Sequence, residues 1–179
     1  IRSAELFDPL TETWTPTGNL IDPLETFSMT VLQDGTVLVA GGKNTETLDA
    51  AAACEIYNPD TGVWVATGSL NMPRVLHTAT LLPDGRVLAS ARYNNQLNLP
   101  SAVTSELYDP ATGVWTFTGN LSYARYNHIA EFLQDGNVLV AGGNSYQRPA
   151  GIYHPLLAPV AHAGDDQAIP GGAGGSPGD

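Results

Sequence analysis

The chain has 179 residues, 42% hydrophobic and 14% charged, and its seven basic and eighteen acidic residues give a formal net charge of -11. This balance argues against a nucleic acid or an anionic membrane as partner, because both need clustered Lys and Arg. No apolar run approaches the 18 residues of a membrane helix, and one cysteine, Cys54, allows no disulfide within the chain.

One segment of sixteen residues, here called the repeated phrase, occurs three times in the sequence. It begins at Glu5 (ELFDPLTETWTPTGNL), Glu55 (EIYNPDTGVWVATGSL) and Glu106 (ELYDPATGVWTFTGNL), so its copies are 50 and 51 residues apart. A period of about 50 residues is typical of propellers, solenoids and arrays. The chain begins with Ile1, inside a repeat and without a secretory signal, so we expect it to be a piece of a longer chain.

Each repeat predicts four short strands. The first strand begins at His77 or His128, an Asp-Gly hairpin comes next, the second strand is rich in Val and Leu, and a variable loop leads to the third strand. The turn at 109–113 then leads to a fourth strand that carries the tryptophan. In the first repeat Glu12 stands where Gly62 and Gly113 stand, so a left-handed residue there would cost about 1 kcal/mol.

The chain therefore predicts an all-β fold, a β-propeller of four-stranded antiparallel blades. Residues 3–20 supply the outer half of one blade, 27–70 and 77–121 two complete blades, and 128–154 the first strands of another. This is about three blades' worth, two complete and two partial. Because closed propellers usually have four to eight blades, we expect further blades in a longer parent chain, with a homo-oligomer as the alternative.

Three repeated features resemble the kelch repeat, over residues 3–154. They are a diglycine that ends the second strand, an aromatic residue in the third, and a tryptophan seven residues later. The residues concerned are Gly41, Gly42, Gly142, Gly143, Phe7, Tyr57, Tyr108, Tyr153, Trp14, Trp64 and Trp115. The segments HTATLLPDGRVL and AELFDPLTETW are similar to the bacterial, galactose-oxidase-type branch of this family. The second repeat has Ala91 and Arg92 in place of the diglycine, which indicates either local divergence or a side chain aimed at a ligand.

Residues 1–157 are expected to form the kelch-type segment, and 158–179 to be a linker and the beginning of another domain. The phrase PVAHAGDDQAIPGG from Pro159 resembles the start of a polycystic-kidney-disease-type immunoglobulin-like domain. The alternative is a flexible Gly-rich tail. These resemblances together imply a secreted or cell-surface bacterial protein.

The candidate ligand-binding residues lie in the loops between second and third strands and in the links between blades, because function on a repeat scaffold concentrates where loops vary. Aromatic rings with amide and guanidinium donors suit sugar hydroxyls or polar peptide surfaces. The set is Arg74, His77, Arg92, Tyr93, Asn95, Arg125, Tyr126, His128, Tyr146 and Arg148. The alternative for these loops is an ordinary solvated surface.

The two Arg-x-x-His pairs, at Arg74 and Arg125, place His77 and His128 at the start of the first strands. In galactose-oxidase-like proteins a copper-ligand histidine occupies a similar position, but no matching constellation of tyrosine, histidine and cysteine is present here. Phe27 takes the same position in the first repeat, which favours packing and hydrogen bonding for both histidines. We therefore predict no cofactor and no metal, and a small buried Cys54.

The favoured function is a non-catalytic binding module that recognises a glycan or a protein through these loops. One alternative is a fragment of a galactose-oxidase-like carbohydrate-active enzyme whose catalytic residues lie in other blades. The other is a structural propeller segment that oligomerisation completes.

Overall fold

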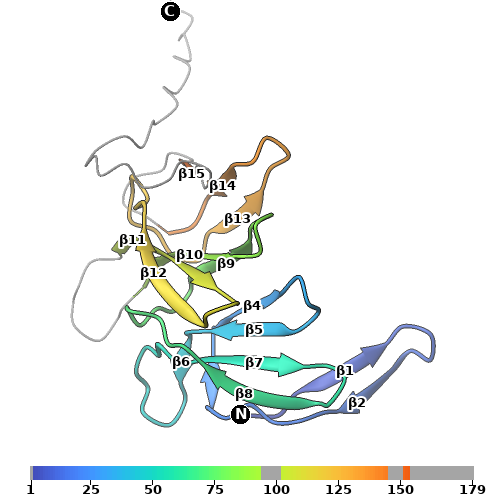
Figure 1. The fold of residues 1–179 in the computed structure, drawn as a ribbon. Helices are drawn as coiled ribbons and strands as arrows, with labels where there is room; N and C mark the ends of the chain where they lie inside the picture. The colour runs from blue at the N-terminus through green and yellow to red at the C-terminus, as the bar shows by residue number, and fades with distance from the viewer. Residues whose placement is uncertain (1, 94–101, 145–150, 154–179) are drawn as a thin grey trace, which may run out of the picture.

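The computed structural model describes residues 2–93, 102–144 and 151–153, in which every regular element is a strand (Figure 1). The strands are β1 (Glu5–Asp8), β2 (Thr13–Pro16), β3 (Leu24–Glu25), β4 (Ser28–Val31), β5 (Val37–Ala40), β6 (Lys43–Asn44), β7 (Cys54–Asn58), β8 (Val63–Thr67), β9 (Thr78–Leu81), β10 (Val87–Arg92), β11 (Ala102–Asp109), β12 (Val114–Thr118), β13 (Ile129–Phe132), β14 (Val138–Ala141) and β15 (Gly151–Tyr153). The predicted all-β class is therefore confirmed. In the described part of the chain, no helix has the length and apolarity that a membrane crossing requires.

The strands form antiparallel sheets, and in all of them except the ribbon β3–β6 the strands lie side by side in the order in which they follow along the chain. The first sheet is the hairpin β1–β2, the second has the order β4-β5-β7-β8, the third β9-β10-β11-β12, and the fourth β13-β14-β15. A two-stranded ribbon, β3–β6, lies beside the second sheet. The second and third sheets are thus complete four-stranded meanders, which matches the strand count read from residues 27–70 and 77–121.

The predicted turns have the backbone that their glycines permit. Gly35, Gly85 and Gly136 close the hairpins between first and second strands with φ of 84°, 87° and 93°. In the first sheet Glu12 has φ 54°, whereas Gly62 has φ 68° at the same place in the second sheet. A side chain in the left-handed region costs about 1 kcal/mol, so the first hairpin retains strain that its copies avoid.

The first strands of three sheets, β4, β9 and β13, lie next to one another (Figure 1). Polar contacts connect them: Ser28 Oγ lies 2.9 Å from His77 Nε2, and Thr78 Oγ1 lies 2.9 Å from His128 Nε2. The two contacts therefore join equivalent positions, and the second lies one repeat further along the chain. The sheets consequently fan out from a shared row of first strands.

Apolar side chains fill the three spaces between consecutive sheets. Because successive residues of a strand point to opposite faces, Val39 packs toward the first sheet, and Leu38 and Ala40 toward the third. In the third sheet Val87 belongs to the layer shared with the second sheet, and Leu88 to the layer shared with the fourth. Each complete sheet is therefore covered on both faces, which explains the near-continuous hydrophobic runs of the second strands.

The repeated Thr-Gly pair after the fourth strand fits against the next sheet. Thr17 Oγ1 lies 2.7 Å from the Tyr57 hydroxyl, and the Gly18 carbonyl accepts a 2.8 Å hydrogen bond from Trp64 Nε1. A Cβ on Gly18 would lie 2.0 Å from the Gly62 carbonyl oxygen, so only glycine fits there. The sixteen-residue phrase thus encodes contacts between sheets as well as a hairpin.

Candidate functional site

Strand alternation gives the sheets two different ends. The Asp-Gly hairpins and the turns at 58–62 and 109–113 share one of them, the turn end. At the other end, second strands finish and the chain passes from one sheet to the next, through residues 72–77, 91–93, 123–128 and 142–144; we call these residues the linker end. Seven of the ten candidate residues lie at the linker end. Asn95, Tyr146 and Arg148 lie outside the described residues.

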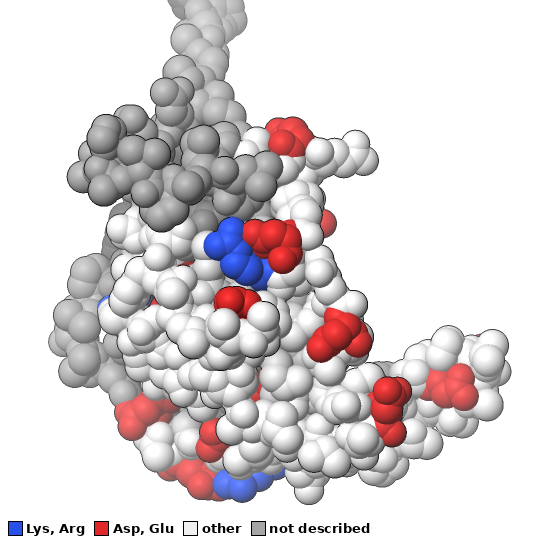
Figure 2. All heavy atoms as spheres, in the orientation of Figure 1, with Lys and Arg blue, Asp and Glu red and all other residues white. Residues whose placement is uncertain are grey.

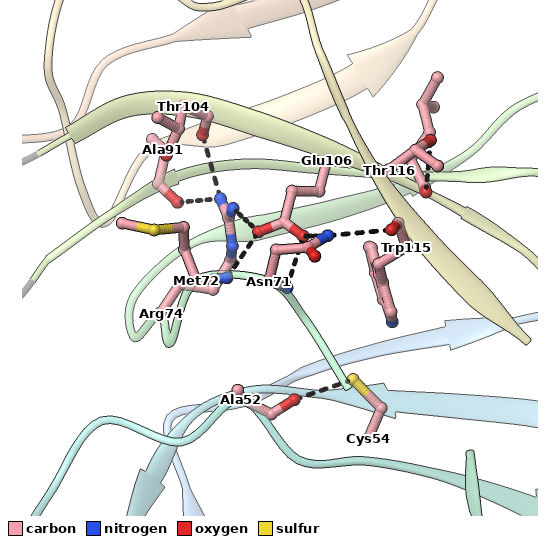
Figure 3. A network of polar contacts seen from close by, with 11 residues as sticks. Ala52, Cys54, Asn71, Met72, Arg74, Ala91, Thr104, Glu106, Trp115 and Thr116 are labelled. Atoms are coloured by element: carbon pink, nitrogen blue, oxygen red, sulfur yellow. Dashed lines mark hydrogen bonds and ion pairs between the residues drawn. The ribbon is translucent and has the colours of Figure 1, made fainter. Parts of the chain in front are cut away.

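Arg74 is fully buried in a polar network with Glu106 (Figure 3). Its Nη2 donates to Glu106 Oε1 at 2.5 Å, and its Nη1 donates to the carbonyls of Ala91 and Thr104 at 2.9 and 3.0 Å. Burial lowers the pKa of the Arg74 guanidinium, the hydrogen bond and charge of Glu106 oppose this, and the positive charge of Arg92 adds to it. Both terminal nitrogens of Arg74 therefore serve the protein's own structure.

Glu106 holds the link between the second and third sheets. Its two oxygens also accept hydrogen bonds from the backbone N–H groups of Asn71 and Met72, at 2.7 and 3.1 Å, and from Asn71 Nδ2 at 2.9 Å. Glu55 does the same one repeat earlier, where it accepts from the N–H groups of Ile21 and Asp22 at 2.8 Å each. These carboxylates cap the linkers, and the threefold recurrence of Glu in the repeated phrase was the sequence signal for them.

His77 and His128 are buried behind the first strands. Each imidazole Nε2 meets a hydroxyl of the preceding sheet, as described above, and each Nδ1 is buried without a hydrogen-bond partner. Burial lowers the pKa of His77 to about 3, with further contributions from Arg74 and His128, and lowers that of His128 to about 4, with a contribution from Arg125. Neutral, hydroxyl-bonded imidazoles agree with a packing role for both residues.

Arg125 repeats the position of Arg74 at the next linker. Its Nη1 donates to the Gly142 carbonyl at 3.1 Å, as Arg74 Nη1 does to that of Ala91. Burial lowers the pKa of this guanidinium. In the sequence of the fourth sheet, Gly151 stands where the third sheet has Glu106.

Tyr93 and Tyr126 are brought together from two different repeats. Their ring centroids lie 4.5 Å apart with planes tilted by 40°, and both residues are partly exposed. The backbone fixes them, because Tyr93 N donates to the Val75 carbonyl at 3.0 Å and Tyr126 pairs with Asn144. The pair therefore presents a fixed aromatic surface at the linker end.

Arg92 stands where the second and fourth sheets have the second glycine of the pair. A Cβ on Gly42 would lie 2.6 Å from the Glu25 carbonyl oxygen, and one on Gly143 2.7 Å from that of Tyr126. In the third sheet Ala91 takes the left-handed conformation, with φ 61°, and the register shifts between Ser90 and Arg92. This irregularity admits a long side chain where the neighbouring sheets hold none.

Other reactive groups give no catalytic cluster in the described chain. Cys54 is buried, and burial raises its pKa to about 11, so it remains a thiol, as the sequence predicted for a small buried residue. Among the described residues, no group of three or more His, Cys, Asp or Glu side chains has a metal-binding arrangement.

No family model matches this chain, and no curated protein matches it either.

Proposed function

We propose that this chain is a kelch-type β-propeller segment of a larger secreted or cell-surface bacterial protein. Four-stranded meanders, first strands in a shared row, and apolar layers between consecutive sheets are what radially packed blades require. The geometry of the residues that carry the kelch resemblance supports this proposal: Gly41 and Gly42 have positive φ, and Tyr57 and Trp64 are buried between sheets.

We further propose that the segment is a binding module that recognises a glycan or a protein through its linker end. The observation that carries this proposal is the Tyr93–Tyr126 pair, which two consecutive repeats present as one partly exposed aromatic surface. Stacked or tilted rings with hydroxyl groups suit the flat faces of sugars and polar peptide surfaces. The turn end offers short, repetitive loops of the Asp-Gly type, which give less scope for specificity.

An oxidase fragment is less well supported by the described residues. His77 and His128 each use Nε2 on a neighbouring hydroxyl, and Cys54 lies in the apolar layer between the second and third sheets. A structural segment that other repeats or a second chain complete remains a candidate, because the first sheet leaves Phe7 and Trp14 exposed. That role is compatible with binding at the linker end.

The test is a glycan and peptide binding screen on the full 179-residue chain, followed by Tyr93→Ala and Tyr126→Ala. Both substitutions should weaken binding at least about tenfold, since each removes half of the aromatic surface. Arg86→Thr is the matched control: Arg86 lies at the turn end, paired with Asp84, and the second sheet has Thr36 in that position. Binding that survives both tyrosine substitutions but is lost in Arg86→Thr would place the site at the other end.

A further inference from the structure

We propose that the Arg92 guanidinium binds the carboxylate of an acidic sugar, so that the ligand is an anionic glycan. This rests on the proposed function, because it names the class of ligand for the linker end. The starting observation is an imbalance of charge around Arg74: its network holds one carboxylate, Glu106, whereas a second guanidinium, that of Arg92, adds a positive charge that acts on Arg74.

Glu106 is already fully used. Its two oxygens accept four N–H donors, from Asn71, Met72 and Arg74. A carboxylate in this state neutralises Arg74 and the linker amides but has no further oxygen lone pair aimed at Arg92. In Figure 3 the dashed lines that start at Glu106 end on Arg74, Asn71 and Met72.

Arg92 itself has no counterion among the described residues. It is 8% exposed, its Nε is buried without a hydrogen-bond partner, and no hydrogen bond or ion pair joins it to the described part of the chain. The two terminal nitrogens of Arg92 are not among the buried unpartnered atoms, so they reach the surface, where a ligand can approach them. An oxyanion is the acceptor that a guanidinium recognises with two parallel hydrogen bonds.

The repeat shows that the architecture does not require this cation. In the second sheet the positions of Arg74 and Arg92 hold Leu24 and Gly42, and that sheet forms the same four-stranded meander. In the fourth sheet Gly143 occupies the position of Arg92. A charged side chain that appears in one repeat only, and at the end where the loops vary, is placed for recognition rather than for folding.

The overall charge favours a sugar with isolated acid groups over an acidic peptide. The chain carries a net charge of -11, and acidic side chains are scattered over the described surface in Figure 2, where basic ones are few. A partner with many negative charges would be repelled over its whole length. A glycan can bring a single carboxylate to Arg92 while its neutral rings contact aromatic surface such as Tyr93 and Tyr126.

The experiment compares two ligands that differ only at C6, methyl glucuronide with a carboxylate and methyl glucoside with a hydroxymethyl group, by calorimetric or NMR titration of the full chain. We expect the glucuronide to bind at least about tenfold more tightly, since a charge-assisted hydrogen bond to a guanidinium contributes that much. Arg92→Gly, which installs the residue of the second and fourth sheets, should abolish the difference and leave glucoside binding unchanged. Arg92→Lys should retain part of it, and Arg86→Thr should retain all of it.

The outcomes separate the two proposals. Equal binding of glucuronide and glucoside would overturn the assignment to Arg92 while leaving glycan recognition intact. Binding of neither sugar, together with binding of an acidic peptide that depends on Arg92, would overturn the glycan ligand. Sodium sulfate should compete with the glucuronide in the native chain; competition that persists in Arg92→Gly would show that the anion binds elsewhere.

Discussion

The same hairpin occurs three times in the described residues. Its aromatic pair is exposed in the first copy and buried in the other two. In the first sheet Phe7 and Trp14 have centroids 5.1 Å apart and are 47% and 63% exposed. In the second sheet Tyr57 and Trp64 keep nearly the same spacing, 4.9 Å, but are only 4% and 9% exposed. The hairpin and its aromatic pair are therefore local structure, whereas burial is supplied by the preceding sheet.

The covering segment explains the difference. Tyr57 and Trp64 are bonded to Thr17 and Gly18, which follow the fourth strand of the sheet before them. Thr67 likewise lies 2.6 Å from the Tyr108 hydroxyl of the third sheet. Within the described residues no such segment lies over Phe7, so the same tryptophan should matter for stability in one sheet and hardly at all in another.

The largest expected effect comes from the tryptophans. Trp64→Ala should lower the free energy of unfolding by about 3–5 kcal/mol, because it empties a packed layer between two sheets. Trp14→Ala, in the exposed copy, should cost less than about 1 kcal/mol. Urea unfolding followed by far-UV circular dichroism measures both. Equal losses would mean that the first hairpin is covered in solution.

The carboxylates of the repeated phrase give the next contrast. Glu106→Gln should cost about 3 kcal/mol, because it leaves the buried Arg74 guanidinium without its charge partner. Glu5 occupies the same position in the exposed first sheet, so Glu5→Gln is the matched control and should leave the unfolding midpoint unchanged. A fully stable Glu106→Gln variant would contradict the capping role of this carboxylate.

The histidine position gives a contrast in pH dependence. His77 and His128 have folded-state pKa values lowered to about 3 and 4, below the unfolded value of about 6.5. The unfolded chain therefore binds more protons below pH 6.5, and stability should fall by about 1.4 kcal/mol per pH unit per histidine as pH decreases toward 4. His77→Phe, which copies Phe27 of the second sheet, should reduce this slope between pH 6 and 4.5. An unchanged slope would show that His77 is not buried as a neutral ring.

The smallest effect concerns the turn of the exposed hairpin. Glu12→Gly should stabilise the chain by up to about 1 kcal/mol, because it relieves a left-handed backbone that glycine adopts freely. The reciprocal change, Gly62→Ala at φ 68°, should destabilise by a similar amount. Thermal melts of the two variants, compared with the parent chain, test the pair; shifts of the same sign would contradict the argument.

The amino-acid sequence alone determined the all-β class, the four strands of each complete sheet and the turns. These follow from alternating apolar residues, Asp-Gly pairs and Pro-Gly turns, which act over a few residues. It also predicted the position at which Glu12 takes a left-handed backbone, because the equivalent turns carry glycine.

Only the tertiary structure decided which side chains become buried and what they meet. Arg74 and Glu106 are 32 residues apart, Tyr93 and Tyr126 belong to different repeats, and no local pattern reveals either contact. In the sequence Arg92 is a broken diglycine, whereas in the structure it follows a register shift of the strand and has no ion-pair partner among the described residues, because Glu106 accepts from other donors. Contacts of this kind depend on how whole sheets stack, because the relevant neighbours come from distant parts of the chain.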